Sequence, residues 1–137
     1  MNQEPSRAFT PAAAIVAIIL VVPATLAAGL LVVIYKWFLS GVLTTSWLPG
    51  IVNKIALLWF PSLLHGGIAG LLAMAGTRRL FKYADLNAVT YATSAVYVTL
   101  SVLIWTLNLR LYGVQEDTVS LAAQTIGLIA GLSEGRR

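Results

Sequence analysis

The chain has 137 residues, of which 58% are hydrophobic and only 10% are charged, and its formal net charge is +4. Soluble globular domains carry roughly 25% charged residues, so this chain has too little polar surface for a water-soluble body, and lipid is the expected solvent. The basic residues stand singly or in pairs between apolar runs, which disfavours nucleic-acid binding, and the lack of cysteine excludes disulfides, iron–sulfur clusters and cysteine zinc sites.

The first predicted helix covers residues 11–39, an apolar run long enough to cross a bilayer, because spanning takes about 20 residues. A cleavable signal peptide is the alternative, with residues 12–22 as its apolar region and residues 23–28 as its cleavage site. The apolar run continues through residues 30–34 without a polar break, which favours a membrane helix. Pro23 lies in mid-span and predicts a kink, because proline removes a backbone donor.

The second predicted helix covers residues 49–75, and the third covers residues 86–112. Pro61 predicts a kink in the second helix, and Gly76 suits its exit. Asp85 is a natural N-cap for the third helix, because its carboxylate can accept bonds from the first free backbone N–H groups.

The fourth predicted helix covers residues 118–132, which is only about 15 residues or roughly 22 Å of helix, shorter than a hydrocarbon layer of about 30 Å. A helix lying in the interface or re-entering the membrane is the alternative. However, its apolar residues surround the helix, whereas an interfacial helix is one-sided and basic. We therefore predict that this helix also spans.

The basic residues test this count of four spans independently. Four spans place six of the nine basic residues on the side of the two termini: Arg7, Arg78, Arg79, Lys82, Arg136 and Arg137. Only Lys36, Lys54 and Arg110 lie on the other side. This asymmetry follows the positive-inside rule when both termini are cytoplasmic. The sequence thus predicts an all-α integral membrane protein with a single domain, a small antiparallel bundle of four transmembrane helices.

His65 is the only histidine and the only ionisable side chain near the centre of a predicted span. Three interpretations are open for its imidazole. It can form a hydrogen bond to a neighbouring helix, bind the metal of a haem or chlorin, or belong to a polar pathway. A haem with two histidine ligands would need its second histidine from a partner or from another copy of the chain.

Small residues form two ridges on the predicted helices, and such ridges let another helix approach closely. The ridge on the second helix also offers room for a flat macrocycle beside His65, and it contains Ser62, Gly66, Ala69, Gly70, Ala73 and Thr77. The ridge on the fourth helix contains Ala123, Gly127 and Gly131, with Gln124 next to it. We expect both ridges to serve in assembly, either within the bundle or with a partner.

Polar side chains follow three- and four-residue steps along the third helix. This polar stripe consists of Asn87, Tyr91, Ser94, Tyr97, Ser101, Trp105 and Asn108. Hydroxyl and amide groups avoid lipid, so the stripe is expected to face protein, water or a ligand. It can form a seam between helices, expected against the second helix and His65, or it can line a cavity or pore.

Catalytic and metal-binding motifs are missing from the sequence. The five carboxylates all lie in tails, loops or helix starts: Glu4, Asp85, Glu116, Asp117 and Glu134. A proton-coupled transporter usually places a carboxylate within the membrane, and no phosphate-binding loop or acidic metal cluster occurs in the sequence. We therefore predict no catalytic residue and no metal site in this chain alone.

These observations favour a non-catalytic accessory or anchoring subunit of a larger membrane complex. Its partners would be membrane lipids and other integral membrane subunits, or further copies of itself. Two alternatives remain open: a small homo-oligomeric channel or transporter that uses the polar stripe, and a subunit that carries haem or chlorin on His65. High alanine and low lysine relative to arginine favour the inner membrane of a bacterium.

Overall fold

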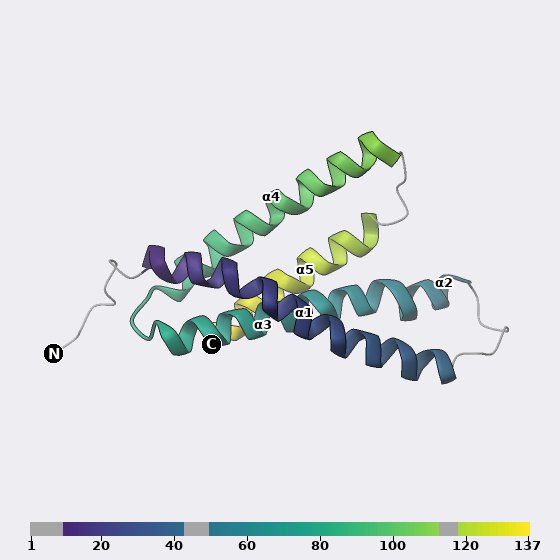
Figure 1. Cartoon of the computed structure of the whole chain (residues 1–137), viewed down its shortest axis with the longest axis horizontal. Coiled ribbons are helices and arrows are strands. Elements are labelled where there is room, and N and C mark those ends of the chain that lie inside the picture. Colours follow the sequence, from purple (N-terminus) through teal and green to yellow (C-terminus); the bar gives the residue numbers. More distant parts are fainter. Residues whose placement is uncertain (1–9, 43–49, 113–117) are drawn as a thin grey trace.

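The computed structural model describes residues 10–42, 50–112 and 118–137, and within these ranges the side chains other than those of 40–42, 53–54 and 108–112. The described ranges are helical apart from short turns and contain no strand, which confirms the all-α prediction. The elements, which Figure 1 shows in sequence colours, are α1 (Thr10–Val42), α2 (Gly50–Lys54), the π-helical turn η2 (Ile55–Trp59), α3 (Phe60–Leu80), α4 (Leu86–Tyr112) and α5 (Thr118–Gly135).

The elements α2, η2 and α3 form one helical run, and this run extends five residues beyond the predicted end at residue 75. Gly76 is therefore not its exit. Gly76 packs against α1 instead, where an added Cβ would lie 3.2 Å from Leu20 Cδ1. The run ends where the backbone N–H of Phe81 donates to the carbonyl of Thr77 at 2.8 Å.

Pro61 disturbs this run in a specific way. It lies in the first turn of α3, directly after the π-helical turn η2. Proline has no N–H to donate, and a local π-helical turn is a common way for a helix to accommodate such a break. The Ser62 hydroxyl donates to the carbonyl of Leu58 at 2.7 Å, so this carbonyl accepts a side-chain hydrogen bond next to the break. In contrast, α1 continues through Pro23 as an α-helix.

The helix α4 begins and ends at the predicted residues. The Asp85 carboxylate accepts bonds from the backbone N–H groups of Asn87, at 3.0 Å, and Ala88, at 3.3 Å. Asp85 is thus an N-cap. The helix α5 runs to Gly135, three residues beyond its predicted end.

Three helical stretches are long and apolar enough to cross a membrane, judged by their length and composition: Thr10–Leu39, Gly50–Leu80 and Leu86–Leu107. This fits a membrane protein. The 18-residue α5 is not among these stretches. At 1.5 Å per residue it is about 27 Å long.

The closest helix pair is α3 with α5, and these two helices run in the same direction. Leu63, Gly67 and Leu71 on α3 face, in that order, Gly127, Gly131 and Gly135 on α5. The two predicted ridges therefore pack against each other within the chain.

Their glycines are needed for this approach. A Cβ added at Gly66 would overlap the backbone carbonyl of Gln124, and one added at Gly70 would overlap that of Leu128. The backbones of α3 and α5 are in direct contact as a result, and no larger residue fits at these positions.

A third face of small residues, not predicted from the sequence, lies on α1. Its buried residues recur at three- and four-residue steps: Ala13, Ala17, Val21, Ala24 and Ala28. This face packs on α3, where Ala69, Ala73 and Met74 are buried, and together they form much of the core. The helix α4 packs against α1 and α5.

The start of α4 is tied to both of these neighbours. The backbone N–H of Asp85 donates to the Thr10 hydroxyl at 3.3 Å, and the Arg136 guanidinium donates to the side-chain amide oxygen (Oδ1) of Asn87 at 2.7 Å. The starts of α1 and α4 and the end of α5 therefore lie at one end of the molecule (Figure 1).

Gly66→Ala is expected to destabilise the fold, whereas Gly67→Ala is not. The added methyl overlaps the α5 backbone at Gly66 but makes an ordinary 3.7 Å contact with the Gly127 carbonyl at Gly67. Overpacking of this kind costs about 1–3 kcal/mol, while alanine is a better helix former than glycine by about 0.5–1 kcal/mol. Unfolding of both variants in detergent micelles by added SDS measures the difference. Equal stability of the two variants would contradict the observed α3–α5 spacing.

Candidate functional site

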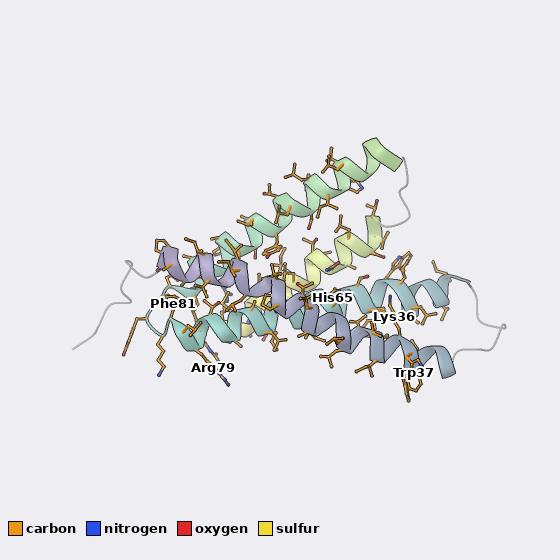
Figure 2. All side chains as sticks on the ribbon, viewed as in Figure 1. Lys36, Trp37, His65, Arg79 and Phe81 are labelled. Atoms are coloured by element: carbon orange, nitrogen blue, oxygen red, sulfur yellow. The ribbon has the colours of Figure 1, made fainter. Side chains whose placement is uncertain are left out.

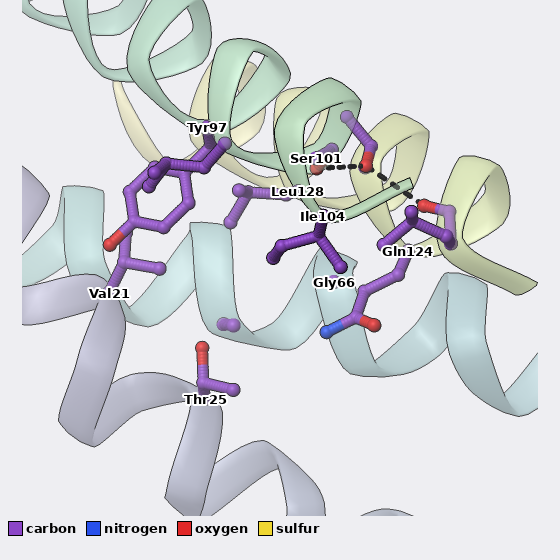
Figure 3. Close-up of a pocket in the computed structure, with 12 residues that line it drawn as sticks. Val21, Thr25, Gly66, Tyr97, Ser101, Ile104, Gln124 and Leu128 are labelled. Carbon is purple, nitrogen blue, oxygen red and sulfur yellow. Dashed lines mark hydrogen bonds between the residues drawn. The ribbon is translucent and has the colours of Figure 1, made fainter. Parts of the chain in front are cut away.

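A cavity of about 250 Å³ lies where α1, α3, α4 and α5 meet (Figure 3). Residues from all four helices line it: Val21, Thr25, Gly66, Ala69, Tyr97, Leu100, Ser101, Ile104, Leu121, Gln124, Thr125 and Leu128. The cavity brings together the first ridge at Gly66, two members of the polar stripe and Gln124 beside the second ridge. The predicted features thus converge on one place, and we treat this cavity as the candidate site.

Three hydroxyl groups at the cavity already donate hydrogen bonds to other protein groups. The Tyr97 O–H donates to the carbonyl of Ile18 at 2.8 Å and ties α4 to α1. The Thr125 O–H donates to the carbonyl of Leu121 on its own helix at 2.9 Å. Since Thr125 has only one such hydrogen, the Ser101 O–H is the donor in the 2.9 Å contact between the Ser101 and Thr125 oxygens. This second bond ties α4 to α5.

Two further polar groups project into the cavity (Figure 3). They are the hydroxyl of Thr25 on α1 and the side-chain amide of Gln124 on α5. Neither side chain has a hydrogen bond within the described parts of the chain. The cavity therefore contains unused hydrogen-bond donors, and no charged side chain lines it.

His65 fixes the turn of α1 that carries Thr25. Its Nε2–H donates to the Thr25 backbone carbonyl at 2.8 Å, because a carbonyl can only accept. A Cβ added at Gly29 would lie 3.8 Å from this nitrogen, which is an ordinary van der Waals distance. Figure 2 places His65 between the end labelled with Lys36 and Trp37 and the end labelled with Arg79 and Phe81.

This arrangement bears on the haem or chlorin interpretation of His65. The Nε2 atom is already engaged, which leaves Nδ1 as the nitrogen with a free lone pair in the neutral ring. The ridge at Gly66 and Gly70, where a macrocycle would have to approach, is covered by the backbone of α5. In the described ranges, no group of three or more histidine, aspartate and glutamate side chains is placed to hold a metal ion.

The other ridge residues are distributed along the helix contacts. Ala73 is buried in the core, and Ser62 bonds its own helix at Leu58. Gly127 and Gly131 are buried against α3, and Ala123 is half-buried at the start of this ridge.

The polar stripe divides among several environments. Tyr97 and Ser101 face the cavity, and the Trp105 indole N–H donates to the Thr118 hydroxyl at 3.0 Å. The Ser94 hydroxyl is buried and has no hydrogen-bond partner among the described residues, whereas Tyr91 is 74% exposed. The side chain of Asn108 lies outside the described residues.

The neighbours of the stripe also differ from the expectation. Asn87, Tyr97, Ser101 and Trp105 bond to α5 or α1, rather than to the second predicted helix and His65. The reason is that α3 lies between α1 and α5 and uses its small-residue faces for these two helices, which leaves α4 to pack on them from outside.

The predicted polar stripe leaves out two polar residues of the buried face of α4. Thr90 and Thr93 are buried, and within the part of the chain that the structure describes the Thr93 hydroxyl has no hydrogen-bond partner. The signal was the spacing of Leu86, Thr90, Thr93 and Tyr97, which combines apolar and hydroxyl residues on one helical face. The predicted polar stripe was chosen from the most polar residues alone, and it therefore marks a side of α4 that is rotated away from the buried side.

Comparisons of the chain with protein family models, with curated proteins and with solved structures find no match.

His65→Leu is expected to lower the free energy of unfolding by about 0.5–1.5 kcal/mol, because it removes the bond that joins α3 to α1. His65→Gln keeps an N–H donor at a similar reach and is expected to retain part of this stability. The same SDS unfolding assay compares the two variants with the wild type. If both substitutions leave the stability unchanged, the bond to Thr25 does not hold these helices together.

Proposed function

We propose that this chain is a non-catalytic accessory subunit that assembles with another integral membrane protein. The observation that carries the proposal is the position of α4. It is the least apolar of the three candidate spans, yet only 17% of the residues in its most apolar stretch are buried within the chain. Polar side chains in membrane helices favour protein neighbours over lipid, so the free side of α4 is the expected contact surface.

The two ridges do not provide this surface, because each covers the other. The outer side of α4 does carry exposed polar groups, since Tyr91 and Thr99 are exposed there beside Val102 and Leu103. A homo-oligomeric channel is supported less well. Tyr97 and Ser101 would line its pathway, but their hydroxyl groups donate hydrogen bonds to α1 and α5 instead.

We further propose that all four helices cross the membrane in alternating directions, with both termini in the cytoplasm of a bacterium. The starts of α1 and α4 and the end of α5 lie at one end of the molecule (Figure 1). The described basic residues concentrate near the same end, at Arg78, Arg79, Lys82, Arg136 and Arg137. This distribution supports a cytoplasmic location for that end.

Introduced cysteines test this topology cleanly, because the chain has none of its own. In intact bacterial cells, a membrane-impermeant maleimide is expected to label Ser46→Cys but to label Lys82→Cys and Arg137→Cys only after the membrane is opened. Labelling of Arg137→Cys in intact cells would show that α5 does not cross.

Assembly is tested by purifying a tagged chain from its native membrane in mild detergent and identifying the proteins that remain bound. We expect one other integral membrane protein in a fixed ratio. Leu103→Trp on the exposed side of α4 is expected to reduce its recovery several-fold, whereas Leu26→Trp on the exposed side of α1 is the matched control and should not. A homo-oligomer without any partner protein would contradict the proposal.

A further inference from the structure

We propose that the cavity between the four helices binds a neutral, lipid-soluble molecule whose carbonyl oxygen accepts hydrogen bonds from Thr25 and Gln124. This binding site is independent of the assembly proposed above, because it is formed by the chain alone. The chemistry of this ligand follows from two observations: which hydrogen-bond donors at the cavity have no protein partner, and which side chains form the cavity walls.

The hydrogen-bond donors that remain free at the cavity indicate which ligand group it can bind. Tyr97, Ser101 and Thr125 donate to protein oxygens. The donors that remain are the Thr25 hydroxyl and the two N–H bonds of the Gln124 amide, which project into the cavity from α1 and α5 (Figure 3). A ligand that brings an acceptor oxygen gives these donors the hydrogen-bond partner that the described protein groups do not supply.

The side chains that line the cavity indicate that most of the ligand is apolar. Apart from the polar groups, the lining consists of valine, alanine, glycine, leucine and isoleucine side chains, and no charged group is among them. Water would find its two to four polar partners only beside these polar groups and not along the rest of the wall. A mostly apolar wall with a few placed polar groups is instead typical of a small-molecule site. A charged ligand would find no counter-charge here.

The size and access of the cavity fit a lipid-soluble molecule. Its volume of about 250 Å³ suits a small ring system. Two of its lining residues on α4 are partly exposed, Leu100 at 43% and Ile104 at 49%. The lining of the cavity therefore reaches the outer surface at α4, on a side of the bundle that would face lipid tails. A molecule dissolved in the membrane can enter without crossing a polar layer.

The test uses two probes with the same carbon skeleton. Menadione is a neutral naphthoquinone with two carbonyl oxygens, and 2-methylnaphthalene has the same methylated ring pair without them. The full chain is labelled with ¹⁵N in its glutamine side chains, of which there are three, Gln3, Gln115 and Gln124. We expect menadione to shift the Gln124 amide signal saturably and to leave the other two unchanged. The hydrocarbon should bind at least about threefold more weakly.

Two substitutions locate the bond to the carbonyl. Thr25→Val removes the free hydroxyl but keeps the shape of the side chain, and it is expected to weaken menadione binding roughly threefold to tenfold. Thr99→Val is the matched control, because the Thr99 hydroxyl is exposed on α4 and bonds its own helix at Ala95. It should leave menadione binding unchanged.

The wild-type comparison of the two probes stands even if Thr25→Val fails to fold. Three results would overturn the proposal. They are equal binding of both probes, similar shifts of all three glutamine signals, and the absence of any saturable shift at Gln124. The last result would mean that water, rather than a ligand, satisfies the amide.

Discussion

The direct contact between the backbones of α3 and α5 is the constraint on which the rest of the structure depends. In a lipid solvent two apolar helices gain little from leaving their surroundings, so close packing must hold them together. Glycine at positions 66, 70, 127 and 131 permits this approach. Once α3 and α5 are joined in parallel, α1 can lie on α3 through its alanine face, and α4 must pack on α1 and α5. The cavity is the space that these four helices cannot fill.

The sequence predicted the helices well, because their signals are local. Apolar runs and the Asp85 cap depend only on neighbouring residues. The predicted end of the second helix was wrong, because Gly76 does not end the helix but packs against Leu20 of α1. The two glycine ridges were also recognisable as close-packing surfaces. Their spacing could not say which surface each would meet, because that depends on the order and direction of all the helices.

The candidate site was only partly predictable for the same reason. His65, Tyr97, Ser101 and Gln124 stand out as polar residues in apolar surroundings, whereas Thr25 acquires its place only when α1 lies beside α3. The stripe on α4 was assigned the wrong neighbour because periodicity gives a helical face but not its partner. The function proposed for the chain, an accessory membrane subunit, therefore rests on the exposed side of α4, and the proposed ligand site rests on the donors left unused in the cavity.

Disulfide formation between Met74→Cys and Gly135→Cys tests the parallel contact of α3 and α5 most directly. A Cβ at position 135 would lie 2.8 Å from the Met74 Cβ, which is closer than the roughly 3.5–4.5 Å of a disulfide, so the last turn of α5 must move slightly apart for the bond to form in this otherwise cysteine-free chain. Mild oxidation in micelles should join this pair rapidly, and should leave Met74→Cys unjoined to Thr118→Cys, which stands at the other end of α5. Rapid joining of Met74→Cys to Thr118→Cys instead would mean that α5 runs in the opposite direction, and the account of the cavity would fail with it.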